Sequence, residues 1–553
     1  MKFSEPGNIG DLTIKNRIVM APMISNLSNP DGCTNENHIS YLEERAKGGT
    51  GLIITEYTYI DNINARGSRN QAGVYNTDFI PKFRRLTERI HNYDTRIFMQ
   101  LVHAGGKAFL DTNRQGPMAP SPVDYVGYTP REMTPDDIER VIADYVRAAK
   151  FVKNSNFDGI ELHGAHGYLI QEFISPGLNQ RTDKYGGSFE GRMKFPQEII
   201  DAVRGSVDLT MGIRLSLYED EQGGYGPDYG LKAAEHLSGI DYVHFSAGRL
   251  APPGSSSSFY GNKTHIADRL PRKAKITTMV VGSVTNAQDA EKVMEKSDFV
   301  SVGRGMLADP FFATKIIQNS PFLRPCIRCN QACRDLSFGE VRCTVNPDTG
   351  LEALHRHTDA LHGDLAVVGA GVMGLEASIL AAKRGMKVTL YDQRDGIGGQ
   401  LLEITDSYKK TEFQSLLKYY SEILRKLGIE VRLNEKYSGK GLYCMPRVLY
   451  PSLPQKDTIL VDSTIYRHHD EALKMSGKHR IIMTSRSLSS LDRVRLDSYR
   501  KLAMKAGIEF TDDLSLKFDV RMIERHQYDI RSAMVAGRGK FMEFVMENSS
   551  EYL

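Results

Sequence analysis

Residues 158–168 read Asp-Gly-Ile-Glu-Leu-His-Gly-Ala-His-Gly-Tyr, an apolar run that ends in a glycine-rich turn bearing polar side chains. Up to about residue 320, short apolar runs of this kind alternate with longer amphipathic stretches such as 135–155. The eight runs are Arg17–Met23, Gly51–Glu56, Arg96–Val102, Asp158–His163, Met211–Ser216, Ile240–Ser246, Ile276–Gly282 and Asp298–Gly303. Eight strand–helix units over this length predict an α/β fold that begins with a (β/α)8 TIM barrel.

Polar side chains gather where the fourth run ends. His163 and His166 are three residues apart, and Tyr168 follows two residues later. TIM barrels carry their chemistry at the carboxyl ends of the strands, so we expect these side chains to face one pocket. Imidazoles can polarise a carbonyl group, and a tyrosine can give a proton to a carbon with carbanion character. We interpret the three as catalytic; the alternatives are a histidine pair that only orders a loop, or a weak metal site.

Glycines follow the seventh and eighth runs, in Val281-Gly282-Ser283 and in Val302-Gly303-Arg304-Gly305. The backbone N–H groups of such turns can approach a phosphate closely, and Arg304 adds positive charge. Because TIM barrels commonly bind phosphate after strands seven and eight, these turns predict a phosphorylated cofactor.

Four of the six cysteines fall between residues 326 and 343, with the spacing C-x2-C-x3-C-x9-C. They are Cys326, Cys329, Cys333 and Cys343. Thiolates at this density bind a soft metal or an iron–sulfur centre. The uneven spacing favours a [4Fe–4S] cluster over zinc, whose sites usually show two separated C-x2-C pairs. Disulfides are a weaker alternative because no signal peptide precedes these cysteines. We therefore expect a redox protein.

A second nucleotide motif begins after residue 363. The apolar run 364–368 leads into Gly369-Ala-Gly371-Val-Met-Gly374, and Asp392 ends the next apolar run. The glycines permit a tight turn and the approach of a pyrophosphate, while the acid suits a ribose hydroxyl. Together they predict a Rossmann-like site for an adenine dinucleotide.

Composition sets limits on the partners. The 553 residues include 71 basic and 68 acidic ones, a net charge of +3 at pH 7, with no run of Lys or Arg that would indicate nucleic acid binding. No apolar stretch approaches the length of a membrane span, and the amino terminus lacks the apolar segment of a signal peptide. We expect a cytoplasmic protein that binds neither nucleic acid nor membrane.

In combination, the motifs of the first 350 residues resemble those of the Old Yellow Enzyme-type NADH:flavin oxidoreductases. Within that superfamily the chain resembles the larger iron–sulfur flavoproteins typified by 2,4-dienoyl-CoA reductase and trimethylamine dehydrogenase. The matching motifs are Lys15-Asn16-Arg17, Ala21-Pro22-Met23, Gln100-Leu101-Val102-His103, the 163–168 stretch, Tyr185-Gly186-Gly187, Arg214, Gly303-Arg304 and the four cysteines. The resemblance implies that FMN is held by Pro22, Met23, Gln100, Arg214, Ser283, Gly303 and Arg304. It also implies that Tyr168 donates a proton and that His163 and His166 bind the substrate's oxygen.

For the second half, the resemblance implies an FAD domain, with FAD preferred over ADP, to which Gly369, Gly371, Gly374, Asp392 and Gln400 contribute. Relatives insert a second dinucleotide domain for NAD(P)H. In this chain the glycine turn of that second domain is absent, because Gly477 is the only glycine between Asp462 and Lys478. The expected divisions are 1–320 for the barrel, 321–350 for the cluster, 363–440 plus about 516–553 for the FAD or ADP domain, and 441–515 for a remnant of the NAD(P)H domain.

The leading functional hypothesis is an FMN-dependent ene-reductase that receives electrons through a [4Fe–4S] cluster and delivers hydride to an activated alkene. The missing second nucleotide site suggests a ferredoxin or a flavoprotein as the electron donor; the alternative is that NAD(P)H reduces FMN directly at the mouth of the barrel. One alternative is an oxidative dehydrogenase of a small substrate that passes electrons to a protein acceptor. Another is an electron-transfer flavoprotein without a substrate. The sequence leaves the oligomeric state open, a homo-oligomer included.

Overall fold

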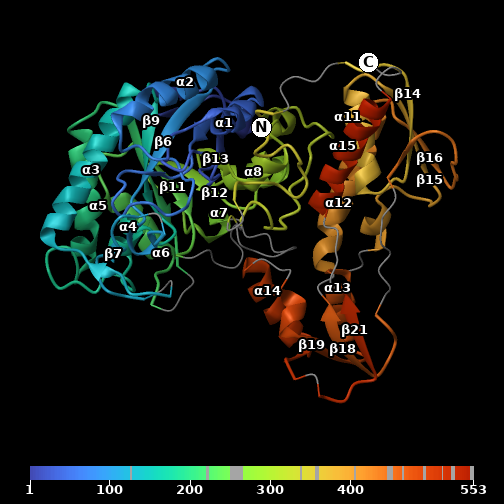
Figure 1. Ribbon diagram of the computed structural model, residues 1–553. Helices are drawn as coiled ribbons and strands as arrows, with labels where there is room; N and C mark the ends of the chain where they lie inside the picture. Colours follow the sequence, from blue (N-terminus) through green and yellow to red (C-terminus); the bar gives the residue numbers. More distant parts are fainter. Residues whose placement is uncertain are drawn as a thin grey trace.

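A computed structural model gives the fold of this chain. It describes all residues except 112, 125–126, 220–222, 250–265, 335, 337–338, 355–359, 404–406, 445–452, 464–465, 490–492, 514, 525–529 and 549–553. Figure 1 shows a barrel on one side and, on the other, a layer of long helices beside a small sheet, with a second small sheet below.

Eight parallel strands form a closed barrel, which confirms the predicted TIM barrel. The strands are β3 (Ile18–Met20), β4 (Leu52–Ile54), β6 (Arg96–Val102), β9 (Gly159–Gly164), β10 (Thr210–Ser216), β11 (Tyr242–Ser246), β12 (Thr277–Val281) and β13 (Phe299–Val302). Each lies within or overlaps one of the eight predicted runs. The first strand pairs with the last, Val300 opposite Ile18, so the sheet has no free edge.

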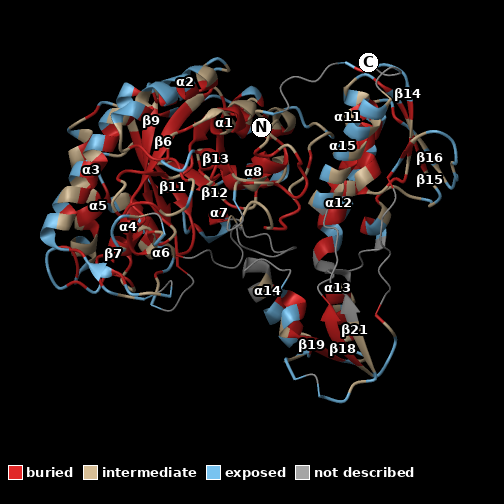
Figure 2. Cartoon of the chain, in the orientation of Figure 1, coloured by how far each residue is buried: buried red, intermediate tan, exposed pale blue. Residues whose placement is uncertain are grey.

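The outer ring consists of helices whose inner faces pack on the barrel (Figure 2). The main ones are α1 (Glu36–Lys47), α2 (Ile80–His91), α3 (Pro135–Asn154), α5 (Phe189–Arg204), α6 (Pro227–His236), α8 (Ala287–Met294) and α10 (Phe312–Ile317). Local sequence sets their starts. In α3, Thr134 and Asp137 form a reciprocal capping box and Pro135 occupies the first turn, where its missing N–H costs nothing.

A hairpin closes the amino-terminal end of the barrel. Strands β1 (Gly7–Ile9) and β2 (Leu12–Ile14) are antiparallel, and Ile9 and Ile14 are fully buried. They join an apolar layer that includes Val19, Phe98 and Phe299 from the barrel strands. With this end plugged, the carboxyl ends of the strands form the open rim.

The second half begins with a Rossmann-like unit, as predicted. Its sheet has the order β16-β15-β14-β17 and is wholly parallel. Its elements are β14 (Asp364–Val368), α11 (Val372–Lys383), β15 (Lys387–Asp392), α12 (Ser407–Lys426), β16 (Glu430–Leu433) and β17 (Leu442–Tyr443). The last helix, α15 (Ile530–Glu547), returns to this unit and packs on α11. The approach is close, because a Cβ on Gly537 would lie 2.1 Å from the carbonyl oxygen of Met373.

A second parallel sheet, of order β20-β19-β18-β21, lies between these parts in the sequence. Its elements are β18 (Thr458–Ser463), α13 (Tyr466–Met475), β19 (Arg480–Thr484), α14 (Arg493–Lys505), β20 (Glu509–Thr511) and β21 (Val520–Glu524). We expected the chain to return to the first unit from about residue 516. Instead β21 pairs with β18 along its whole length, so the second sheet extends to residue 524.

The connector between the halves contains the four cysteines and has no helix or strand among its described residues after α10 and before β14. It lies on the barrel, where the side chains of Asn346 and Thr349 both donate to the carbonyl of Leu307, at 2.9 and 2.8 Å. Two ion pairs also hold the connector. Arg45 of α1 pairs with Glu352 on the barrel side, and Arg328 pairs with Glu412 of α12 in the second half.

One buried carboxylate joins three parts of the second half. Glu376 of α11 is fully buried and accepts from Arg324 of the connector at 2.8 Å and from the Tyr420 hydroxyl of α12 at 3.0 Å. Arg538 of α15 lies 3.5 Å away on the other carboxylate oxygen and also pairs with Asp348. The connector, the Rossmann-like helices and the carboxyl-terminal helix therefore share one charge network.

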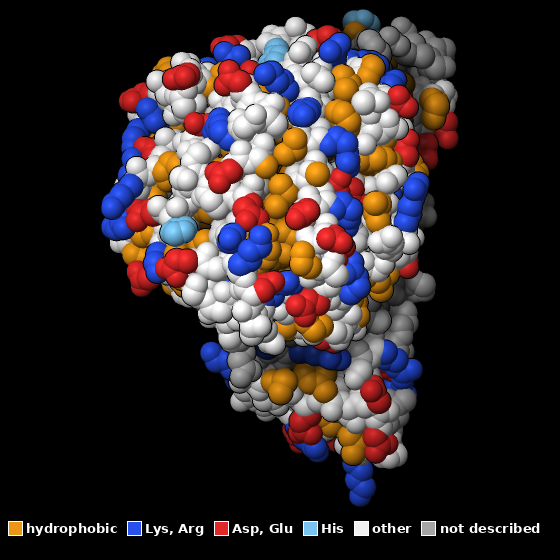
Figure 3. Space-filling model, turned by 90° about the vertical axis from the view of Figure 1, so that its left-hand side faces the viewer, with side chains coloured by type: hydrophobic (Ala, Val, Ile, Leu, Met, Phe, Trp, Pro, Cys, Tyr) orange, Lys and Arg blue, Asp and Glu red, His pale blue; other side chains and the backbone are white. Residues whose placement is uncertain are grey.

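Basic and acidic side chains are interspersed on the face of the molecule that Figure 3 shows. Over the described part of the chain, no helix has both the length and the apolar character required to cross a bilayer.

Substitution of Glu376 tests the charge network. We expect Glu376→Ala to lower the stability of the carboxyl-terminal half by about 3 kcal/mol or more, because it leaves Arg324 buried without a counter-charge. The change is measured as a shift of the urea unfolding transition followed by far-UV circular dichroism. Glu422→Ala is the matched control, since Glu422 pairs with Arg425 on the surface of α12 and should change stability by less than about 0.5 kcal/mol. Equal effects of the two substitutions would contradict this role for Glu376.

Candidate active site at the barrel rim

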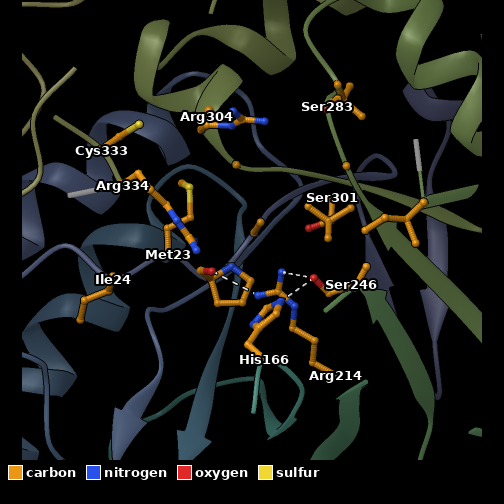
Figure 4. Close-up of a pocket in the computed structure, with 18 of the residues that line it drawn as sticks. Met23, Ile24, His166, Arg214, Ser246, Ser283, Ser301, Arg304, Cys333 and Arg334 are labelled. Carbon is orange, nitrogen blue, oxygen red and sulfur yellow. Dashed lines mark hydrogen bonds between the residues drawn. The ribbon is translucent and has the colours of Figure 1, made fainter. Parts of the chain in front are cut away.

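A cavity of about 320 Å³ opens at the rim formed by the carboxyl ends of the barrel strands. Its walls combine residues that are far apart in the sequence: Pro22 and Met23 after β3, His163 in β9, Arg214 in β10 and Ser246 at the end of β11. The loops after β12 and β13 supply Ser283, Gly303 and Arg304, and the cysteine segment supplies Cys326, Cys333 and Arg334. Figure 4 shows several of these side chains around the cavity, among them those of Met23, Arg214, Ser246, Ser283, Arg304, Cys333 and Arg334. Most residues predicted to bind FMN or to act in catalysis thus meet in one place.

The predicted catalytic residues form a compact aromatic cluster. The His163 and His166 rings are 5.2 Å apart and nearly perpendicular, and the Tyr168 ring lies 4.8 Å from His163. His166 has a left-handed backbone, with φ of 60°, which turns the chain back toward the cavity. Its Nε2 lies 2.6 Å from the Ser246 hydroxyl, so the fourth and sixth strands fix its ring together.

Burial keeps both imidazoles neutral. Removal from solvent, together with the nearby Arg214 guanidinium, holds the pKa of His163 and of His166 well below the ordinary value. At neutral pH each ring therefore carries one N–H donor and no charge. Burial raises the pKa of Tyr168 above its usual range, and the hydrogen bond from Tyr57 partly offsets this. Tyr168 is accordingly a protonated phenol that can donate.

Tyr57 and Lys107 line the cavity but were not predicted from the sequence. Tyr57 follows β4, and its hydroxyl hydrogen-bonds to that of Tyr168, with the rings 5.1 Å apart. Lys107 ends the short 3-10 helix η3 (Gly105–Lys107); its Nζ donates to the carbonyl oxygen of His166 at 2.8 Å and lies 4.9 Å from the centre of the Tyr168 ring. Both residues follow a predicted strand, and this position was the one feature of the sequence that could have indicated that they line the cavity.

Five buried polar atoms of cavity-lining residues have no hydrogen-bond partner among the described residues: Arg214 Nε, Ser283 Oγ, Ser301 Oγ, and Nε and Nη1 of Arg328. Burying such atoms without a partner is costly, so they favour a polar ligand in the cavity. Burial lowers the pKa of Arg214 to about 10, so its guanidinium stays charged at neutral pH. A cationic donor and two hydroxyls suit the polar edge and the phosphate of FMN.

The loop after β13 packs against the residues that follow β3. A Cβ on Gly303 would lie 2.9 Å from the Met23 sulfur, so a larger residue there would displace the Met23 side chain. Arg304 donates to Asn330 at 2.6 Å, which ties the loop after β13 to the cysteine segment. The residues present therefore fit FMN.

Gln100 does not line the cavity. It lies in β6 and donates to the buried carboxylate of Glu161 at 2.6 Å. Glu161 also accepts from Tyr242 at 3.0 Å and contacts His244 Nδ1 at 2.9 Å. Gln100 Oε1 has no partner among the described residues. Gln100 is thus part of a polar network beneath the site, and its predicted contact with FMN stays a prediction.

The four cysteines are free thiols that lie close enough to affect one another. Burial raises the pKa of Cys333 well above its usual range, and the neighbouring Cys329 and Cys343 raise it further. Burial likewise raises the pKa of Cys326 and of Cys343. Among the described residues, no three His, Cys, Asp or Glu side chains are placed to share one metal ion.

Four free cysteines in one segment supply the donor set of a [4Fe–4S] cluster, which binds one thiolate to each of its irons. The residues present therefore fit such a cluster, and four thiolates are also a donor set for a zinc ion.

The Rossmann-like turn has the expected geometry. A Cβ on Gly374 would lie 1.8 Å from the carbonyl oxygen of Gly369, so the third glycine permits close contact between strand and helix. Asp392 ends β15 and accepts from the backbone N–H groups of Ala370 at 2.6 Å and Arg394 at 2.9 Å. Gly371 faces the 398–399 segment through a bridge to Gly398, and Gln400 lies exposed beside it. The turn fits a dinucleotide, with Asp392 also bracing the backbone.

The corresponding position in the second sheet is filled by side chains. Ser463 ends β18, and its hydroxyl contacts His468 Nδ1 at 2.7 Å. His469 Nε2 lies 2.8 Å from the carbonyl oxygen of Ser463, and both histidines are buried. Asp462, fully buried, pairs with Arg486 at 2.8 Å and with Arg521. Both histidines therefore form part of a packed polar cluster.

Comparison with known proteins follows this division. Residues 2–322 match the model of the NADH:flavin oxidoreductase / NADH oxidase family, and residues 367–426 match an NAD(P)-binding Rossmann-like domain. An NADH oxidase of Thermoanaerobacter brockii is 39% identical over 451 residues, covering 78% of this chain and 69% of the relative. A cinnamate reductase of Clostridium sporogenes is 32% identical over 479 residues, covering 79% of this chain and 71% of the relative.

Solved structures share the whole architecture. A 2-naphthoyl-CoA reductase complex superposes with a TM-score of 0.87 over 98% of this chain and 99% of that chain, at 22% identity. A histamine dehydrogenase from Rhizobium sp. 4-9 superposes with a TM-score of 0.82 over 98% of this chain and 96% of that one, at 20% identity. At these identities the likeness is one of fold, and it extends over both halves of the chain.

Proposed function

Because the chain belongs to the NADH:flavin oxidoreductase / NADH oxidase family and is a flavin-dependent oxidoreductase, we propose that it reduces an activated carbon–carbon double bond. The observation that carries the proposal is the neutral His163–His166 pair beside a protonated Tyr168 in one buried cavity. The reductase name of the Clostridium sporogenes relative gives it further support.

The three residues divide the chemistry between them. FMN, when bound, supplies the hydride that adds to the β-carbon of the substrate. The N–H groups of His163 and His166 hold the oxygen that conjugates with the double bond and stabilise the negative charge that develops on it. Tyr168 donates its phenolic proton to the α-carbon, and Tyr57 orients that phenol through their hydrogen bond. Arg214, Ser283, Ser301 and Arg304 would hold the FMN.

We further propose that Cys326, Cys329, Cys333 and Cys343 hold a [4Fe–4S] cluster, which supplies single-electron chemistry. Cys326 and Cys333 line the same cavity as the catalytic residues. A cluster held by these cysteines would lie at the wall of the flavin site, which supports the transfer of single electrons between the two.

For the second half, we propose an FAD or ADP at the turn formed by Gly369, Gly371 and Gly374, and no nicotinamide at the second sheet. The packed cluster around Ser463 and His468 supports the second part. Electrons would then come from a reduced ferredoxin or flavoprotein. The relatives named NADH oxidase and NADPH dehydrogenase favour a nicotinamide as the electron donor. In that competing route the nicotinamide would enter the barrel cavity itself.

The first test concerns Tyr168. Tyr168→Phe should keep FMN bound and reducible but slow reoxidation of the reduced enzyme by an enone, because only the proton donor is lost. The expected loss is on the order of 100- to 10,000-fold, measured by anaerobic stopped-flow absorbance of the flavin. Tyr75→Phe is the control, because its hydroxyl donates to Asp31 on the outer surface. Wild-type rates in the Tyr168 variant would place the proton donor elsewhere.

Metal content tests the cluster. Anaerobically purified protein should contain about four iron atoms per chain and show the broad absorbance of an iron–sulfur centre. Cys343→Ser tests the ligand with the longest spacer and should lower the iron content, whereas Cys33→Ser, outside the cysteine segment, should leave it unchanged. Zinc in place of iron would refute the proposal.

Anaerobic titration distinguishes the electron donors. If a protein donor is required, NADH and NADPH should leave the flavin band unchanged, and a reduced ferredoxin should then bleach it. Rapid bleaching by either nucleotide alone would refute the protein donor. If a nucleotide alone bleaches the flavin, a ligand that binds the His163–His166 pair should compete with that nucleotide, because both would enter the barrel cavity.

A further inference from the structure

Arg328 lies in the connector between two of the predicted cluster ligands, Cys326 and Cys329, and only 3% of it is exposed. It lines the same cavity as the catalytic residues. A buried guanidinium requires a partner for its charge and acceptors for its N–H groups. The contacts that Arg328 makes, and those that it lacks, therefore indicate what the chain holds at this place.

One nitrogen of the guanidinium is paired within the chain. Nη2 donates to the carboxylate of Glu412 in α12, which is buried as well. Nε and Nη1 are buried and have no hydrogen-bond partner among the described residues, so neither flanking cysteine sulfur accepts from them. The Cys326 sulfur accepts instead from the backbone N–H of Arg328, at 3.4 Å. The guanidinium thus keeps two donor nitrogens for a ligand.

The backbone at Arg328 is a second, independent observation. Its φ of 51° lies in the left-handed region, which favours glycine over residues with a side chain. Ser283, on the same cavity wall, has the same φ and a buried hydroxyl without a partner among the described residues. Such uncommon conformations concentrate at ligand sites, where the surrounding structure holds them. Arg328 and Ser283 therefore share the features of residues that bind one ligand.

The connector segment that carries Arg328 lies against a predicted phosphate-binding turn. Asn330, two residues further on, accepts from Arg304 at 2.6 Å, and this hydrogen bond joins the segment to the turn after β13. TIM barrels commonly bind phosphate at the turns after the seventh and eighth strands, which Ser283 and Arg304 mark in Figure 4. The phosphate is the anionic part of FMN, so it is the part that these turns and a guanidinium would attract.

We propose that Arg328 binds the phosphate of FMN through the nitrogens that Glu412 leaves free. A guanidinium donates charge-assisted hydrogen bonds to phosphate oxygens, and a buried setting strengthens them. The ion pair with Glu412 anchors the side chain to α12. A residue of the connector, held by the second half, would thus complete a flavin site that the barrel otherwise builds. The inference rests on the FMN of the proposed function and is independent of the substrate.

Riboflavin tests this contact, because it is the same flavin without the phosphate. FMN is removed from the full-length protein under anaerobic conditions, and the dissociation constants of FMN and of riboflavin are measured by quenching of flavin fluorescence. Arg328→Gln should weaken FMN binding about 10- to 100-fold and leave riboflavin binding within about twofold. Arg328→Lys, which keeps the charge, should retain part of the preference for FMN.

A double variant keeps the test decisive if the single one is unstable. Arg328→Gln leaves Glu412 buried without its counter-charge, whereas Arg328→Gln combined with Glu412→Gln removes both charges. The double variant should also lose the preference for FMN, while Glu412→Gln alone should keep it, because the guanidinium remains. Arg425→Gln, on the surface of α12, is the control for the type of substitution and should bind both flavins as the wild type does.

An unchanged preference for FMN in the Arg328 variants, or equal weakening of both flavins, would overturn the inference. If iron content falls while the preference stays unchanged, Arg328 serves the cysteine segment instead. Wild-type protein that binds neither flavin would refute the proposed function itself. Wild-type protein that binds FMN, with no effect of Arg328 on the preference, would refute only the phosphate contact.

Discussion

The hydrogen bonds between β13 and β3 are the constraint on which the site depends, because they close the sheet. Closure forces eight parallel strands to end at one rim, and the β1–β2 hairpin fills the opposite end. Side chains separated by almost 300 residues, such as Met23 and Arg304, then face one cavity. The functional residues need not be close together in the sequence; each needs only to follow directly after a strand.

A second constraint is the burial of charge between the halves. Glu376 makes simultaneous contacts with the connector, α12 and α15, so these parts are fixed by one fully buried carboxylate. The connector is thereby tied to the second half, while its hydrogen bonds to Leu307 hold it on the barrel and it supplies Cys326, Cys333 and Arg334 to the cavity wall. The arrangement of the cysteine segment therefore depends on the packing of the carboxyl-terminal half.

Strand periodicity predicted the barrel well, because a buried parallel strand has to be an apolar run that ends at a turn. The same logic located His163, His166 and Tyr168. It did not single out Tyr57, Lys107 or Arg334, whose positions depend on how loops fold across the rim. Gln100 shows where motif matching fails. It lies within a matched motif, but the motif does not reveal that its side chain donates to Glu161.

The second half shows how pairing overrides local pattern. The β21 segment was expected to belong with the Rossmann-like unit but pairs with β18, a choice that depends on long-range register. The loss of the second glycine turn was visible in the sequence. What replaces it was not, because the contacts of His468 and His469 with Ser463 require the folded backbone.

The nesting of the second sheet inside the Rossmann-like unit has an evolutionary consequence. The chain leaves that unit after β17 and returns to it only as α15, which packs on α11. Selection can therefore rewrite the inserted sheet as an independent module, without disturbing either the barrel or the first glycine turn. A ligand site in such an inserted module can be lost while the host fold persists, and the same insertion point offers room to acquire a new partner.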